Sequence, residues 1–107
     1  MYQYKEKYTL NFTNVQSYLD MHFIIRRELD LPDYYGCNWD AFWDCLTEMY
    51  GEDNHIEIIG IDVIERKFDD AADKMLSILR RFKQNNPFPE DDIQIVVVRG
   101  DERIVLS

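Results

Sequence analysis

The sequence predicts a single mixed α/β domain in which helices pack on a small, mainly parallel sheet. The chain has 107 residues, the size of one domain, so residues 1–107 are expected to form one unit. Apolar residues make up 46% of the chain, which is enough for one core. Segments with helical spacing alternate with short β-branched runs in the order β-α-α-β-α-α-β-β, which is typical of parallel strands joined by helices.

The first predicted elements are a strand and a helix. Residues 4–12 alternate loosely between apolar and polar side chains, which predicts a strand. Thr13 or Asn14 is a suitable N-cap for a helix that runs to about Leu29. A loop follows, in which Gly36 is expected to supply an unusual backbone angle.

The second predicted helix covers residues 39–50. Asn38 precedes it as the expected N-cap, and Gly51 follows it as the expected C-terminal stop. The rest of the chain is expected to fold as a strand at 55–61, a short helix at 62–68, a helix from Asp69 or Asp70 to about 85–86, a strand at 92–98 and a last strand at 103–107. The last strand follows a turn, so it is expected to pair back as an antiparallel edge.

The net charge of −9, from 21 acids and 12 bases, argues against several classes of partner. Nucleic acids and anionic membranes would be repelled, so neither is an expected partner. A cationic protein would be attracted, although acidity can also serve solubility alone. The sequence contains neither an apolar run long enough for a membrane span nor an N-terminal signal-peptide core, so a cytoplasmic location is expected.

Motifs for catalysis and metal binding are weak. Asp40 and Asp44 share a predicted helix face and could hold a metal ion, but no phosphate-binding loop accompanies them. His22 lies on an apolar helix face and is expected to be a hydrogen-bonded core histidine. Cys37 and Cys45 form no CxxC pair and are expected to be reduced. The protein is therefore expected not to be an enzyme and to need no metal or cofactor.

The helix predicted at residues 39–50 has three faces. At about 100° per residue, the side chains facing the core are Phe42, Leu46, Met49 and Tyr50, with Trp39 at their edge. On roughly the opposite side lies an acidic stripe, defined as Asp40, Asp44 and Glu48. Trp43 lies between the two. Like charges four residues apart destabilise a helix, so the stripe needs another explanation.

The acidic stripe lies within a longer tract without lysine or arginine. Between Arg27 and Arg66 there are eleven acids and neither of these bases. Tyr34 and Trp43 add large rings, and such rings beside charge are typical of protein interfaces. A solvated helix face with locally packed rings is the alternative interpretation. Bases elsewhere in the chain could also fold back to neutralise the tract.

Residues 28–47, ELDLPDYYGCNWDAFWDCLT, resemble the barstar family of intracellular ribonuclease inhibitors. The terminal IVLS is similar to the closing strand of that family. The resemblance implies a three-layer-like α/β fold with a mainly parallel three-stranded sheet, about four helices and room for an extra C-terminal edge strand. It also implies an immunity-type or antitoxin-type inhibitor, a monomer that binds one basic ribonuclease as a 1:1 heterodimer and mimics RNA phosphate.

The resemblance and the acidic stripe together predict seven partner-binding residues: Tyr34, Gly36, Asn38, Asp40, Trp43, Asp44 and Glu48. The resemblance implies that Asp44 takes the place of the RNA phosphate and that Asp40 pairs with a second cationic group. It also implies that Tyr34 packs near the catalytic histidine of the ribonuclease, that Gly36 allows close approach and that Trp43 packs at the margin.

Some positions depart from the family pattern. Glu48 and Met49 replace a glycine–tryptophan pair, and Arg81 stands where the family carries an interface glutamate. An arginine there would repel a basic partner, so the cognate ribonuclease is expected to differ in that region. Two other functions remain open: an acidic module that binds a basic partner other than a nuclease, and a metal-assisted hydrolase using Asp40 and Asp44.

Overall fold

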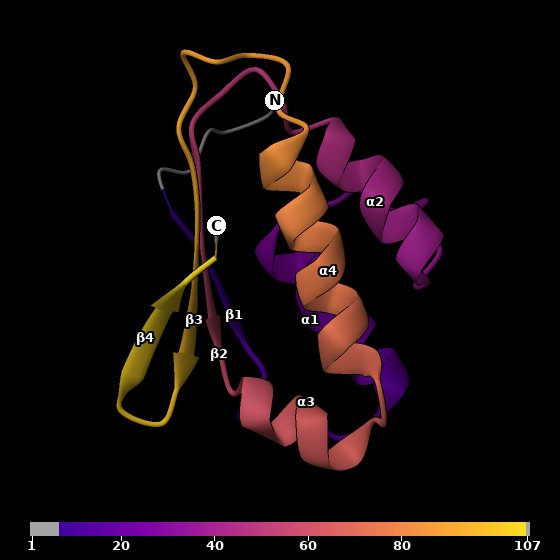
Figure 1. Cartoon of the computed structure of the whole chain (residues 1–107). Helices are drawn as coiled ribbons and strands as arrows, with labels where there is room; N and C mark the ends of the chain where they lie inside the picture. Colours follow the sequence, from indigo (N-terminus) through magenta and orange to yellow (C-terminus); the bar gives the residue numbers. More distant parts are fainter. Residues whose placement is uncertain (1–6, 107) are drawn as a thin grey trace.

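The architecture is a four-stranded sheet with four helices on one side of it (Figure 1). The computed structural model describes residues 7–106. Along the chain the elements are β1 (Tyr8–Asn11), α1 (Tyr18–Glu28), α2 (Trp39–Thr47), β2 (Asn54–Ile59), α3 (Ile61–Lys67), α4 (Ala71–Gln84), β3 (Ile93–Arg99) and β4 (Glu102–Val105). This order confirms the predicted β-α-α-β-α-α-β-β pattern. None of the helices in the described part has both the length and the apolar character needed to span a membrane.

The sheet has the strand order β1-β2-β3-β4. Strand β2 pairs in parallel with both neighbours, so that Ile56 is flanked by Tyr8 on β1 and Ile95 on β3. Strand β4 pairs antiparallel with β3 and forms an edge. The prediction of a mainly parallel sheet with an additional C-terminal edge strand is therefore confirmed.

The two faces of the sheet differ in what covers them. On β3, Ile93, Ile95 and Val97 are buried beneath the helices, whereas Gln94 points to the opposite face and is exposed. Figure 1 shows all four helices on the same side of the sheet. The predicted mixed α/β fold is therefore confirmed. Helices α1, α3 and α4 contact the sheet, α2 packs on α4, and no described helix covers the opposite face.

The core forms between the sheet and the apolar faces of the helices. The fully buried side chains that the helices contribute include Met21 and Ile25 of α1, Phe42 and Leu46 of α2, and Met75, Leu79 and Phe82 of α4. Burial of such apolar area is the main term that stabilises a domain of this size. Helices α2 and α4 lie side by side and pack against each other (Figure 1). The inner face of α2 is thus fixed by the core.

Helix α1 begins later than predicted, at Tyr18. Its N-cap is Ser17, whose hydroxyl oxygen accepts a hydrogen bond from the Asp20 N–H at 3.0 Å. Thr13 instead donates both its N–H and its hydroxyl to the side-chain oxygen of Asn11. The predicted cap at residues 13–14 is wrong because these bonds hold that segment in a turn. Of the predicted first strand, residues 8–11 form β1, and residues 4–6 lie outside the described residues.

The connection from β2 to α3 depends on Gly60. This residue has φ +83°, a left-handed conformation that favours glycine. It also lies against the backbone that follows β1: a Cβ added to Gly60 would be 2.7 Å from the nitrogen of Thr13. Glycine at this position therefore lets the end of β2 and the end of β1 pack together.

Candidate functional site

Helix α2 is started by the capping residue that the sequence predicted. The Asn38 side-chain oxygen accepts a hydrogen bond from the Ala41 N–H at 2.8 Å, and its amide nitrogen donates to the Gly36 carbonyl at 3.2 Å. The unusual backbone angle falls on Cys37, at φ +53°, and not on Gly36. The prediction for Gly36 is therefore wrong. Gly36 lies instead beneath the cap, where an added Cβ would be 3.2 Å from the Asn38 amide nitrogen.

The faces of α2 are largely those predicted. Phe42 and Leu46 are fully buried, and the Cys45 thiol is buried beside them. All three residues of the acidic stripe are exposed. The helix ends at Thr47, earlier than the expected residue 50, and Met49 and Tyr50 are only partly buried. The outer face of α2 therefore displays carboxylates on a helix whose inner face is fixed.

Six of the lysines and arginines in the described chain pair with acids, and all of these pairs lie away from the outer face of α2. Their ion pairs are Lys7 and Arg103 with Glu57, Arg27 with Glu28, Arg66 with Asp62, Lys74 with Asp70 and Arg99 with Glu65. Among residues 7–106, no hydrogen bond or ion pair engages the side chains of Asp40 and Asp44. The two carboxylates thus give this face an unneutralised negative charge.

Glu48, the third member of the acidic stripe, is engaged within the molecule. The hydroxyl of Tyr34 lies 3.2 Å from each of its two carboxylate oxygens and donates to them. This hydrogen bond raises the pKa of the Tyr34 hydroxyl above its ordinary value of 10. Tyr34 as a whole nevertheless remains 71% exposed. The contact ties the loop before α2 to the residue that caps its C-terminal end.

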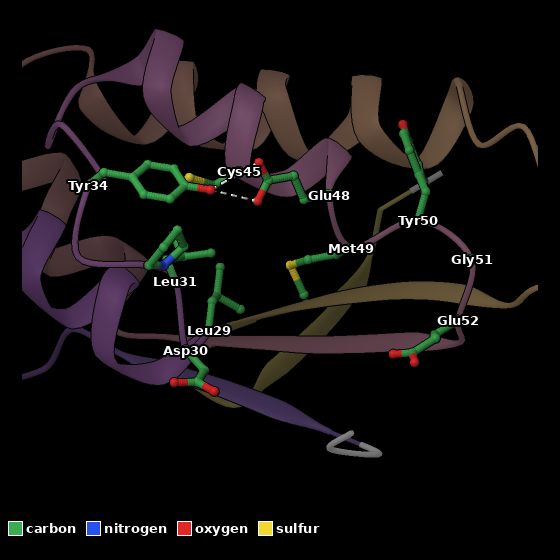
Figure 2. A pocket seen from close by; sticks show the side chains of 11 residues that line it. Leu29, Asp30, Leu31, Tyr34, Cys45, Glu48, Met49, Tyr50, Gly51 and Glu52 are labelled. Carbon is green, nitrogen blue, oxygen red and sulfur yellow. Dashed lines mark hydrogen bonds between the residues drawn. The ribbon is translucent and has the colours of Figure 1, made fainter. Parts of the chain in front are cut away.

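A cavity of about 470 Å³ opens beside the Tyr34–Glu48 contact. Figure 2 shows the carboxylates of Asp30, Glu48 and Glu52 around it, with Leu31 and Met49 among the apolar side chains that line it. Lysine and arginine are absent from its lining. The acidic character of the outer face therefore continues past the end of α2 into the segments on either side of the helix.

A buried aromatic cluster supports the loop from behind. The Nδ1 atom of His22, on α1, is 2.6 Å from the hydroxyl of Tyr35, and both side chains are buried. The His22 ring also packs on Trp39, with 4.8 Å between ring centroids. This confirms the prediction of a hydrogen-bonded core histidine. The contacts join α1 to both ends of the segment that leads into α2.

Burial of His22 makes stability depend on pH. Desolvation lowers the pKa of the imidazole below its ordinary value of 6.5, and its Nε2 atom has no hydrogen-bond partner among the described residues. Below about pH 6.5 the unfolded chain binds a proton that the folded chain does not, so stability falls as pH falls. We expect the free energy of unfolding to fall as the pH is lowered below about 6.5, with a slope no steeper than the one-proton limit of about 1.4 kcal/mol per pH unit.

Urea unfolding at several pH values measures this loss. His22→Asn keeps an acceptor near the position of Nδ1 and is expected to flatten the pH dependence. Equal slopes for the wild type and His22→Asn would contradict the assignment.

Trp43 carries a contact that sequence analysis missed. The guanidinium of Arg81, on α4, lies over its indole ring, 4.1 Å from the ring centroid. Trp43 is partly buried and Arg81 is exposed. The sequence places Arg81 on a predicted helix but gives no sign that it meets Trp43. That contact depends on how α4 docks against α2.

The seven predicted partner-binding residues lie along α2 and the loop before it. Asp40 and Asp44 are exposed and unpaired among the described residues, and Tyr34 and Glu48 are joined to each other. Gly36 and Asn38 form the N-terminal cap, and Trp43 faces α4. Among residues 7–106 no group of three or more histidine, cysteine, aspartate or glutamate side chains is arranged to hold a metal ion. The arrangement suits electrostatic recognition of a cationic surface.

Comparison with known proteins agrees with this geometry. The family model described as "Barstar (barnase inhibitor)" matches residues 6–98, which is most of the chain. A protein of Bacillus subtilis (strain 168), described as "Putative ribonuclease inhibitor YrdF", is 26% identical over 87 residues, which covers 81% of this chain and 89% of that protein. The match includes α2, the loop before it, β1, β2 and all of β3 except its last residue, and on this evidence the chain belongs to the barstar family.

Proposed function

We propose that this protein inhibits a basic ribonuclease by placing the outer face of α2 in the enzyme's active site. Membership of a family described as barnase inhibitors supports a ribonuclease partner. The similarity to a protein described as a ribonuclease inhibitor points the same way. The fold carries the acidic face on a short helix that the core fixes from behind, which suits insertion into a concave site.

One observation carries this proposal: among residues 7–106 no lysine or arginine pairs with Asp40 or Asp44, whereas six of these bases pair with other acids. Repulsion between them destabilises the isolated helix by a few tenths of a kcal/mol. A cationic partner would relieve that repulsion. An active site that holds RNA phosphates must itself be cationic, and it therefore provides the complementary charge.

The mechanism is competition for the phosphate-binding groups. Asp44 lies mid-helix and would occupy the position of an RNA phosphate, while Asp40, one turn earlier, would meet a second cationic group. The ring of Tyr34 is free to pack on the enzyme because only its hydroxyl is engaged by Glu48. Carboxylates on a helix offer the enzyme no phosphodiester bond to cleave, so the bound enzyme stays inhibited. We propose a 1:1 complex, since one copy of α2 would fill one active site.

A titration against ribonucleases tests this proposal. Purified protein is added to a panel of small basic ribonucleases, barnase included, and cleavage of a fluorescent RNA is followed. For at least one ribonuclease of the panel, we expect the activity to fall as this protein is added and to be fully lost at one equivalent. Binding without loss of activity would instead indicate an acidic interaction module. Metal-dependent turnover of phosphoesters by the protein alone would indicate a hydrolase.

Association with the inhibited ribonuclease should depend on salt. The unpaired carboxylates are exposed, so their attraction to a cationic site is screened by added ions. We expect the association rate constant to fall at least about tenfold between roughly 50 and 500 mM NaCl, with a smaller change in the dissociation rate. Stopped-flow fluorescence measures both rates. The Asp40→Asn/Asp44→Asn double variant should show a shallower dependence, and equal slopes would count against steering by these carboxylates.

A further inference from the structure

A fixed cation lies at the margin of the acidic face. The Arg81 guanidinium is 4.1 Å from the centroid of the Trp43 ring, and Trp43 is the residue directly before Asp44. Arg81 is exposed and forms no ion pair with a described residue. Another cation–π contact among the described residues, Arg26 over Phe23, lies on α1.

The position of this cation is held by packing. Helices α2 and α4 lie side by side (Figure 1), and an arginine over an indole face is attracted by the ring's negative potential. Swinging the guanidinium away from a partner would therefore give up the contact with Trp43. Any protein that covers Asp44 and Trp43 approaches Arg81 as well.

The positive charge of Arg81 would be repelled by most ribonuclease active sites. A strand of RNA carries phosphates on both sides of the bond that is cleaved, so the site that binds it tends to be basic on both sides. Like charges brought together across an interface weaken binding and exclude partners. An acceptor opposite Arg81 would convert the same charge into a favourable contact.

We infer that Arg81 is a specificity-determining residue of this face. It favours a ribonuclease that presents a carboxylate toward α4 and weakens binding to one whose site is basic all round. This inference rests on the proposed function, because it specifies the charge of the partner at the same face.

A charge series at Arg81 tests it with barnase, the ribonuclease named in the family description, as the probe. Inhibition constants are measured for the wild type and for Arg81→Lys, Arg81→Gln and Arg81→Glu. Arg81→Glu is expected to lower the inhibition constant at least about tenfold, Arg81→Gln by less, and Arg81→Lys by less than about twofold. Arg81 is exposed, so the variants are expected to fold, and thermal unfolding checks this.

Two controls separate a local contact from a change in net charge. Arg80→Glu makes the same change in charge at the neighbouring position, which is exposed and makes no described contact with Trp43. It is expected to alter the inhibition constant for barnase by less than about threefold. Adding Asp44→Ala to Arg81→Glu should remove the gain, because both residues act on one face.

The outcomes are distinct. The inference is overturned if Arg81→Glu inhibits barnase no better than the wild type or Arg80→Glu, or if it does not inhibit barnase at all. The proposed function is judged separately, by whether the wild type inhibits any ribonuclease of the panel in a manner that requires Asp44.

Discussion

Asp44→Ala is expected to abolish most of the inhibition of the cognate ribonuclease. Removing one member of a desolvated charge pair leaves the cationic group of the enzyme without a partner, which weakens binding by about 2–5 kcal/mol. That range draws in part on the barnase–barstar pair, which represents this family. It corresponds to a dissociation constant roughly thirtyfold to several thousandfold higher. Titration of ribonuclease activity with the variant measures the change.

Folding should survive this substitution. The Asp44 carboxylate is exposed and has no partner among residues 7–106. Alanine is a better helix former than aspartate, and the change also removes repulsion from Asp40. The midpoint of thermal unfolding is therefore expected to stay the same or rise. Asp101→Ala, in the exposed β3–β4 turn, makes the same change in net charge and should leave inhibition intact. Full inhibition by Asp44→Ala would refute the role assigned to its carboxylate.

Among the variants considered, Gly60→Ala is expected to cause the largest loss of stability. The added Cβ would lie 2.7 Å from the Thr13 nitrogen and 2.9 Å from the Phe12 carbonyl carbon, and these backbone atoms cannot move aside as a side chain would. The residue must also keep φ +83°. Left-handed strain contributes about 1–2 kcal/mol and overpacking about 1–3 kcal/mol. Urea unfolding should therefore show a free energy of unfolding lower by roughly 2–5 kcal/mol.

Gly100→Ala is the matched control for this effect. Gly100 also has a positive φ, +61°, but an added Cβ would meet no atom within 4 Å. Its substitution isolates the conformational term, so its loss is expected to be about 1–2 kcal/mol. If the two variants lose equal stability, then the contact between Gly60 and the backbone after β1 does not limit the packing of these strands.

The second helix and the sheet were predictable because their signals are local. Asn38 had the residue type of a cap, and it does accept a hydrogen bond from the Ala41 N–H. The spacing of Phe42 and Leu46 placed both on the inner face, where they are fully buried. The β-branched runs around Ile56 and Ile95 became the two central strands. In each case neighbouring residues in the chain determine the result.

Elsewhere several residues could satisfy the same local rule. Thr13 and Asn14 have the same capping chemistry as Ser17, and the choice depends on the side chain of Asn11, which bonds Thr13. Glycine at position 36 suggested a left-handed angle, but the loop places that angle on Cys37. Which residue caps the helix or adopts the left-handed angle therefore depends on its position in the loop and not on residue type alone.

Contacts between elements were not predictable from spacing. The sequence shows Trp43 on α2 and Arg81 on α4, but their separation of 4.1 Å follows from how the two helices pack against each other. The bond between His22 and Tyr35 similarly requires the loop to fold back on α1. The acidic stripe itself was visible in the sequence. That Asp40 and Asp44 stay unpaired was not, because distant bases had first to be placed.

The two faces of helix α2 have separate roles. Residues that pack in the core point inward, and residues available to another molecule point outward. Exchanging exposed side chains on such a helix usually changes stability by no more than about 0.5 kcal/mol. Under the proposed function, substitutions on the outer face alone can therefore change which ribonuclease is recognised while the fold is kept. The same property makes the chain a suitable scaffold for grafting recognition residues while its interior is left untouched.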